Sequence, residues 1–159
     1  MLQDDDPSYS FEEITIIMRL LDETIAEAAL LRSSEDCPKP LNVAIELGAG
    51  TGRITPFLAA RAGHLTAIEF VPEFTDRNSA KCAAKGITNV TCITADARET
   101  KNLPASIDLA FVKWILMYLI DDDAKALLAQ IVERLTPGGV LFINESCAPE
   151  GIDASLHVD

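Results

Sequence analysis

The sequence lacks a long uninterrupted apolar run, which argues against a membrane protein. Its most apolar stretch, residues 107–120, is broken by Asp108 and Lys113, whereas a membrane-spanning helix needs about 20 consecutive apolar residues. The first residues include three aspartates at positions 4–6 and no basic flank, unlike a secretory signal peptide. We therefore expect no association with a membrane.

Cysteine and histidine are also scarce, and their placement argues against a metal site. The two histidines do not stand at ligand spacing from any cysteine, and no Cys-x-x-Cys pair is present. The four cysteines are scattered along the chain: Cys37, Cys82, Cys92 and Cys147. The sequence therefore predicts no bound metal and a reduced, cytoplasmic compartment.

Basic residues are few, which disfavours a nucleic-acid partner. The chain has 13 Lys and Arg against 25 Asp and Glu, a formal net charge of −12. The acids gather at the ends, with ten acids against three bases in residues 1–40 and four acids and no base in residues 145–159. Such a surface repels phosphate backbones, so we expect neither DNA nor RNA as substrate.

Strand and helix signals alternate along the 159 residues, a length that suits one domain. Helices are expected at residues 11–32, 53–62, 72–85 and 121–135, and strands at 42–47, 65–70, 90–94, 107–113 and 140–144. Ser10 with Glu13 forms a capping box for the first helix, Asp121 can cap the last, and Gly86 can end the third. Residues 137–139, Pro-Gly-Gly, are expected to turn the chain into the fifth strand. The alternation predicts a doubly wound, mostly parallel α/β sheet.

A glycine loop follows the first expected strand and predicts a nucleotide-cofactor site. Gly48, Gly50 and Gly52 have the spacing Gly-x-Gly-x-Gly, whereas a dinucleotide site needs Gly-x-Gly-x-x-Gly. Arg53 follows where the tight dinucleotide packing would be needed. S-adenosylmethionine has no pyrophosphate and needs no such fit, and Glu46 can face its amino group. The pattern favours S-adenosylmethionine over NAD.

Further polar residues follow the next strands, at the edge where an open α/β sheet binds ligands. Glu69 ends the second strand, where its carboxylate can accept both ribose hydroxyls. Asp96 follows the third strand, where it can accept a hydrogen bond from the adenine amino group. Lys113 and Trp114 end the fourth strand.

These segments resemble a known enzyme family. Residues 46–53, Glu-Leu-Gly-Ala-Gly-Thr-Gly-Arg, are similar to motif I of the class I S-adenosylmethionine-dependent methyltransferases. Residues 108–119 and 135–147 are similar to segments of the phosphoethanolamine N-methyltransferases, which methylate phosphoethanolamine stepwise to phosphocholine. The resemblance covers roughly residues 41–147 and implies a Rossmann-like methyltransferase fold. It implies that S-adenosylmethionine is bound by Glu46, Gly48, Ala49, Gly50, Thr51, Gly52, Glu69, Phe70, Asp96, Ala97, Lys113 and Trp114.

The resemblance also indicates candidate catalytic residues: Tyr118, Lys113 and Tyr9. Tyr118 corresponds to a family position near the acceptor nitrogen, or it is a packing tyrosine. Lys113 stands where the family usually has Asn, and it either pairs with a carboxylate or anionic substrate or merely extends to solvent. Tyr9 is a candidate lid residue, and Trp114 is equally compatible with an ordinary core position.

The family normally adds two more strands after the fifth, and no strand signal follows Glu145. We therefore expect an N-terminal helical lid segment (1–40), a cofactor-binding core (41–145) and an acidic tail or truncated continuation (146–159). The fifth strand would then be an exposed edge that another chain could pair with. The alternative to a small-amine N-methyltransferase is a catalytically weak or inactive methyltransferase-like interaction module.

Overall fold

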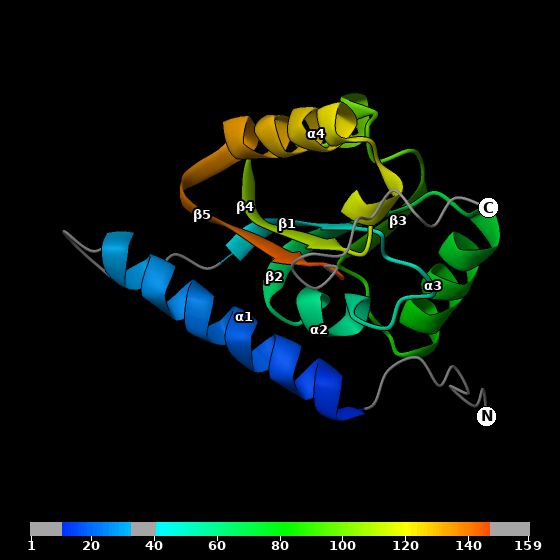
Figure 1. Ribbon diagram of the computed structural model, residues 1–159. Coiled ribbons are helices and arrows are strands. Elements are labelled where there is room, and N and C mark those ends of the chain that lie inside the picture. The colour runs from blue at the N-terminus through cyan, green and yellow to red at the C-terminus, as the bar shows by residue number, and fades with distance from the viewer. Residues whose placement is uncertain (1–10, 33–40, 147–159) are drawn as a thin grey trace.

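A computed structural model describes residues 11–32 and 41–146, and its centre is a parallel five-stranded sheet with helices on both faces (Figure 1). The strand order is β3-β2-β1-β4-β5. The elements in chain order are α1 (Phe11–Arg32), β1 (Leu41–Leu47), α2 (Thr55–Ala59), β2 (Ala62–Glu69), α3 (Pro72–Ala84), β3 (Val90–Thr94), η1 (Thr100–Asn102), β4 (Ile107–Lys113), η2 (Leu116–Tyr118), α4 (Asp121–Arg134) and β5 (Leu135–Asn144). The predicted doubly wound, Rossmann-like fold is confirmed.

The strand order places a topological switch beside β1. The chain runs from β1 outward through β2 to β3, then crosses back so that β4 pairs with the other side of β1. Glu46 at the end of β1 is level with Ala67 of β2 and Phe111 of β4. Ligands of open α/β sheets bind at such a point, beyond the carboxyl ends of the strands.

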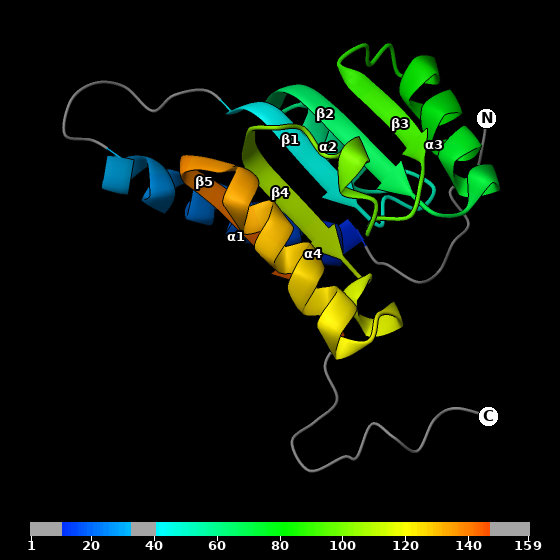
Figure 2. The ribbon, with the colours of Figure 1, turned by 90° about the horizontal axis from the view of Figure 1, so that it is seen from above.

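Alternating side chains of the strands build a core on each face of the sheet. In β4, Leu109 and Phe111 face the layer formed by α1 and α2, whereas Ala110 and Val112 face α4. Figure 2 shows α4 in front of the sheet and α1 behind it. Near-continuous apolar sequence is needed because both faces are covered.

Helix α1 belongs to the described core. Its residues Ile17, Met18 and Leu21 are buried with side chains of the sheet, and the helix contacts β5. Ile17 and Met18 precede Leu21 by four and three residues, so all three lie on one face of an amphipathic helix. Ser10 and Tyr9, with the rest of the expected lid before Phe11, lie outside the described residues.

The start of β5 corrects the expected turn at residues 137–139. The strand begins at Leu135, five residues earlier than predicted, and runs through Pro-Gly-Gly to Asn144. Gly138 has φ of 75°, and the pairing with β4 shifts register between Ile107 and Leu109. The segment is therefore an irregularity inside a strand, which glycine's positive φ permits.

Two helix predictions also need correction. Helix α2 is shorter than the expected 53–62, because the chain already pairs with β1 from Ala62 onward. Asp121 does not cap α4: Ile120 occupies the N-cap position without a side-chain hydrogen bond. Asp121 lies instead in the first turn, where its charge favours the positive end of the helix dipole. Gly86 follows the C-cap of α3 with φ of 67°, as predicted.

Among the described residues, no helix is long and apolar enough to span a membrane. The sheet ends at β3 on one side and at β5 on the other.

Candidate functional site

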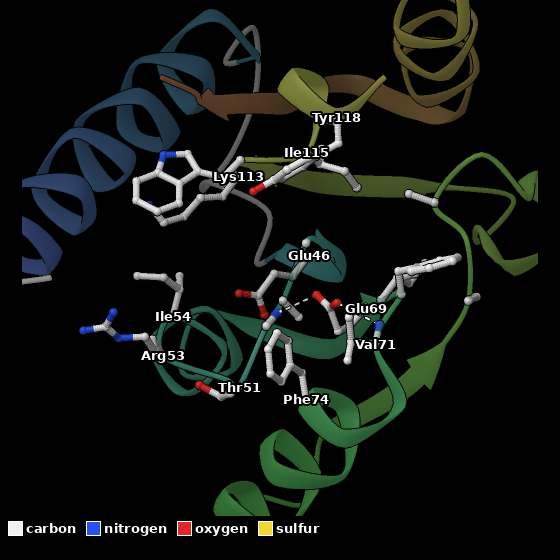
Figure 3. Close-up of a pocket in the computed structure, with 18 of the residues that line it drawn as sticks. Glu46, Thr51, Arg53, Ile54, Glu69, Val71, Phe74, Lys113, Ile115 and Tyr118 are labelled. Atoms are coloured by element: carbon white, nitrogen blue, oxygen red, sulfur yellow. Dashed lines mark hydrogen bonds between the residues drawn. The ribbon is translucent and has the colours of Figure 1, made fainter. Parts of the chain in front are cut away.

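A pocket of about 950 Å³ lies at the carboxyl ends of the central strands. Figure 3 shows Glu46 and Glu69 on one wall, with Lys113, Ile115 and Tyr118 on the opposite wall. The predicted cofactor residues line this pocket, except for Gly52. A pocket of this size suits a nucleoside cofactor and a small second substrate.

The glycine loop adopts a conformation that its glycines make possible. Gly48, Gly50 and Gly52 have φ of 75°, 53° and 76°, a region that other residues rarely adopt. The amides of Gly48 and Ala49 both donate to the carbonyl oxygen of Ile68, at 3.0 and 3.1 Å, which ties the loop to β2. A Cβ atom on Gly48 would lie 2.5 Å from the carbonyl oxygen of Lys113, so the loop also lies against β4.

Gly52 has a structural position rather than one on the pocket wall. A Cβ atom built on it would collide with the side chain of Asn78 on α3. Asn78 is buried, with 1% of its surface exposed. The third glycine therefore allows α3 to pack against the loop.

Glu69 accepts a hydrogen bond at each carboxylate oxygen, one of them from the glycine loop. Its Oε2 accepts a hydrogen bond from the Gly50 amide at 2.9 Å, and its Oε1 accepts one from the Val71 amide at 2.9 Å. A carboxylate has about four lone-pair sites, so acceptor capacity remains for two further donors such as ribose hydroxyls.

Glu46 is buried at the base of the pocket, with 2% of its surface exposed. Its Oε2 accepts a hydrogen bond of 2.6 Å from the Thr55 hydroxyl. Burial raises the pKa of Glu46 to about 8, the Thr55 hydrogen bond opposes this rise, and the nearby charges of Glu69 and Lys113 raise and lower the pKa respectively. A cation entering the pocket would favour the ionised carboxylate.

Asp96 is held by a residue that the sequence reasoning missed. Arg98 donates to both oxygens of Asp96, with its NH2 group 2.6 Å from Oδ2, and its NH1 group donates to Asp123 of α4 at 2.8 Å. The Arg98 side chain, followed by its amide, lowers the pKa of Asp96. Asp96 is therefore a fixed anionic acceptor at the pocket rim. A basic residue two positions after the acid was the available signal.

Lys113 and Trp114 lie together at the end of β4. The Lys113 Nζ donates to Asn144 Oδ1 at 2.9 Å and stands 4.5 Å from the centre of the Trp114 ring. Burial is the main cause that lowers the pKa of Lys113. Trp114 is 38% exposed and has φ of 49°, so it lines the pocket instead of filling the core.

Tyr118 lies in η2 on the wall opposite Glu69, with 76% of its surface exposed. The turn that carries it is held by Glu145, a second residue missed from the sequence. Glu145 Oε1 accepts hydrogen bonds from the amides of Ile115 and Leu116, at 2.8 and 3.0 Å. No local pattern in the sequence indicates this contact, which joins residues about 30 positions apart.

The chain is similar to a family described as a methyltransferase domain, which matches residues 44–139. It is 38% identical over 117 residues to a phosphoethanolamine N-methyltransferase 1 of Triticum aestivum. The matched region covers 72% of this chain and 23% of that protein. A second Triticum aestivum phosphoethanolamine N-methyltransferase is 30% identical over 92% of this chain and 30% of its own length. The chain thus spans less than a third of these relatives.

Solved structures agree with this relationship. Phosphoethanolamine N-methyltransferase 1 of Haemonchus contortus, solved in complex with phosphoethanolamine and S-adenosylhomocysteine, superposes with a TM-score of 0.64 at 26% identity, over 88% of this chain and 29% of that one. One conclusion explains the motif I glycines, the acids at the strand ends and the five-stranded sheet. The chain belongs to the S-adenosylmethionine-dependent methyltransferases.

Proposed function

We propose that this chain forms the cofactor-binding part of an enzyme that methylates the nitrogen of phosphoethanolamine or its methylated forms. The observation that carries the proposal is the similarity to a phosphoethanolamine N-methyltransferase at 38% identity over 117 residues. A neighbouring structure holds phosphoethanolamine together with S-adenosylhomocysteine. The reaction would form part of phosphocholine biosynthesis.

Three acids would hold the cofactor in this proposal. Glu46 would receive its amino group, Glu69 its ribose hydroxyls and Asp96 its adenine amino group. All three line the pocket, and Glu69 and Asp96 are each fixed by hydrogen bonds from the protein. Gly48, Ala49, Gly50, Thr51, Phe70 and Ala97 would complete the wall around it.

The residues opposite the loop would align the acceptor. When bound, S-adenosylmethionine supplies a methyl group on a positively charged sulfur. The protein must then place a neutral amine in line with that methyl group and exclude water. Trp114 and Tyr118 present aromatic surface at this wall, and Tyr118 would orient the amine. Lys113 adds a positive charge that suits a phosphate-bearing substrate. Tyr9, outside the described residues, remains a candidate for covering the site.

The alternative of a non-catalytic interaction module receives no support from the comparisons, although β5 leaves an edge in the described chain. We also retain a reduced cytoplasmic compartment in the proposal, since Cys82 and Cys92 are free thiols.

A methyl-transfer screen tests the proposal. The chain, and a form extended through any natural continuation, would be incubated with S-adenosylmethionine and separate acceptors: phosphoethanolamine, its mono- and dimethylated forms, free ethanolamine, RNA and protein. Methylated phosphobase is the expected product. Methylated RNA or protein without phosphobase turnover would contradict the proposal.

A further inference from the structure

A series of buried, hydrogen-bonded side chains leads from the pocket to helix α3. Thr55 and Asn78 expose 0% and 1% of their surfaces, and Glu46 exposes 2%. Asn78 Nδ2 lies 2.9 Å from Thr55 Oγ1, which lies 2.6 Å from Glu46 Oε2. At its far end, Cys82 Sγ lies 3.6 Å from Asn78 Oδ1. Buried polar groups of this kind are costly unless every member is paired.

The hydrogen atoms in this series have one direction. The Asn78 amide nitrogen is only a donor, so the Thr55 oxygen accepts from it and directs its own proton toward Glu46. The Cys82 thiol donates to the amide oxygen of Asn78, and this contact selects the amide orientation that presents nitrogen to Thr55. Each hydrogen bond therefore prepares the next, and Glu46 receives a donor at one fixed oxygen.

We propose that Thr55 and Asn78 are positioning residues for the amino group of the cofactor: through their directed hydrogen bonds they orient the Glu46 carboxyl group and favour its negatively charged form. The inference rests on the assignment of Glu46 to that amino group under the proposed function. Neither Thr55 nor Asn78 lines the pocket, so both act through Glu46.

The packing around the series explains why the arrangement stays fixed. The space above Asn78 is closed by Gly52, since a Cβ atom there would collide with the Asn78 side chain. The same glycine ends the loop that surrounds the pocket. The Asn78 side chain therefore packs against the loop at Gly52 and also hydrogen-bonds to Thr55.

The charge state of Glu46 makes the role measurable. Burial raises the pKa of this carboxyl to about 8, and the Thr55 hydrogen bond is the largest influence that lowers it. Other titratable groups face it from the surrounding elements: Glu69 of β2, Lys113 of β4, Cys82 of α3 and Cys92 of β3. Burial raises the pKa of both thiols, that of Cys92 to about 11, so they stay protonated near neutral pH.

The test measures binding of S-adenosylhomocysteine between pH 6 and 9 by titration calorimetry. In the parent chain, affinity should rise with pH until Glu46 is ionised near pH 8. Thr55→Val keeps the shape of the side chain and removes the donor. It should shift this rise upward by about one pH unit and weaken binding about tenfold at pH 7, the size expected for one hydrogen bond to a charged group. Thr55→Ser restores the hydroxyl and should restore the profile.

Two controls separate positioning from general damage. 5′-Methylthioadenosine lacks the amino-acid arm, so its affinity should change less than about twofold in Thr55→Val. In a Glu46→Gln background, Thr55→Val should cause no further loss of S-adenosylhomocysteine affinity, because the group it acts through no longer ionises. Asn78→Ala breaks the same series one step earlier and replaces Thr55→Val if that variant does not fold.

Equal loss of affinity for both ligands, or an unchanged pH profile in a folded Thr55→Val, would overturn the inference. A parent chain that binds neither ligand would instead contradict the cofactor site itself.

Discussion

Glu69 Oε2 accepts a hydrogen bond from the amide of Gly50, 19 residues earlier in the chain, at 2.9 Å. The carboxylate proposed to hold the ribose therefore also fixes the middle of the glycine loop. Its other oxygen accepts from Val71 at the start of α3. One side chain links the loop, the end of β2 and the next helix before any ligand is bound.

Glu69→Ala should weaken S-adenosylhomocysteine binding by about 1.5–3 kcal/mol, the range for hydrogen bonds to a charged group. Glu69→Gln should also weaken it, because the amide group of Gln would turn a donor toward either the Gly50 or the Val71 amide. Glu73→Ala removes an equal charge from an exposed position on α3 and should bind like the parent. Titration calorimetry would measure the affinity of all three variants for S-adenosylhomocysteine. Parent-like affinity in a folded Glu69→Ala would show that the cofactor lies elsewhere.

Two glycines of the loop should respond differently to alanine. Gly48→Ala places its Cβ 2.5 Å from a backbone oxygen, whereas Gly50→Ala meets no atom within 4 Å. Gly50→Ala should therefore lose only about 1–2 kcal/mol of folding stability, the cost of positive φ, and Gly48→Ala should lose more. Denaturant unfolding would measure the stability of both variants, and Gly48→Ala should be the less stable of the two.

Gly86→Ala supplies the matched control, since Gly86 has φ of 67° and open space around it but lies at the end of α3, outside the pocket lining. It should lose about as much stability as Gly50→Ala while keeping cofactor affinity. Gly50→Val, with a β-branched side chain at positive φ, should weaken binding at least as much as Glu69→Ala. Equal binding by Gly50→Val and the parent would place the loop outside the cofactor site.

Glu46→Gln should stabilise the empty protein at neutral pH while weakening cofactor binding. The pKa of Glu46 rises in the folded state from an ordinary 4.5 to about 8, so the folded state keeps a proton that the unfolded state releases. Folding therefore loses stability as pH rises from about 4.5 to 8. Gln avoids this cost, and we expect a gain of roughly 1–3 kcal/mol at pH 7. Unfolding of both proteins at pH 5 and pH 8 would measure it; a difference that does not grow with pH would contradict the account.

Glu145→Ala should loosen η2 and disturb the wall that carries Tyr118. The variant loses the acceptor of the Ile115 and Leu116 amides, which leaves two donors without their partner and should cost about 1–3 kcal/mol of stability. Glu145→Gln keeps one carbonyl oxygen for both amides and should lose less. Turnover of phosphobases should fall more than S-adenosylhomocysteine affinity, since the three proposed cofactor acids lie on other segments. Equal losses of turnover and affinity would show that η2 belongs to the cofactor site instead.

Local patterns were sufficient to predict most of the sheet. The bounds of β3 and β4 agree with the predicted residues. The start of β2 was missed because Gly63 and His64 resemble a turn, whereas the structure places both in β2 and pairs Ala62 and His64 with β1. For β5, proline and glycine indicated a turn, and only pairing with β4 converts this segment into an irregular strand. Pairing partners cannot be read from local sequence.

Some residues of the site could likewise be predicted from the sequence, and others could not. Glu46, Glu69 and Asp96 could be predicted because parallel strands bring their carboxyl ends together at one edge. Asn78 and Glu145 could not, because their roles depend on how α3 packs against Gly52 and how the end of β5 meets η2. Such contacts join residues that are distant in sequence and have no spacing rule.

The most direct test of the account is a parallel titration of the chain with S-adenosylhomocysteine and with NAD. The spacing of Gly48, Gly50 and Gly52, with acids at the ends of successive strands, predicts saturable binding of S-adenosylhomocysteine that Glu69→Ala weakens, and no measurable binding of NAD. Equal affinity for the two ligands, or S-adenosylhomocysteine binding that is unaffected by Glu69→Ala, would contradict the central claim.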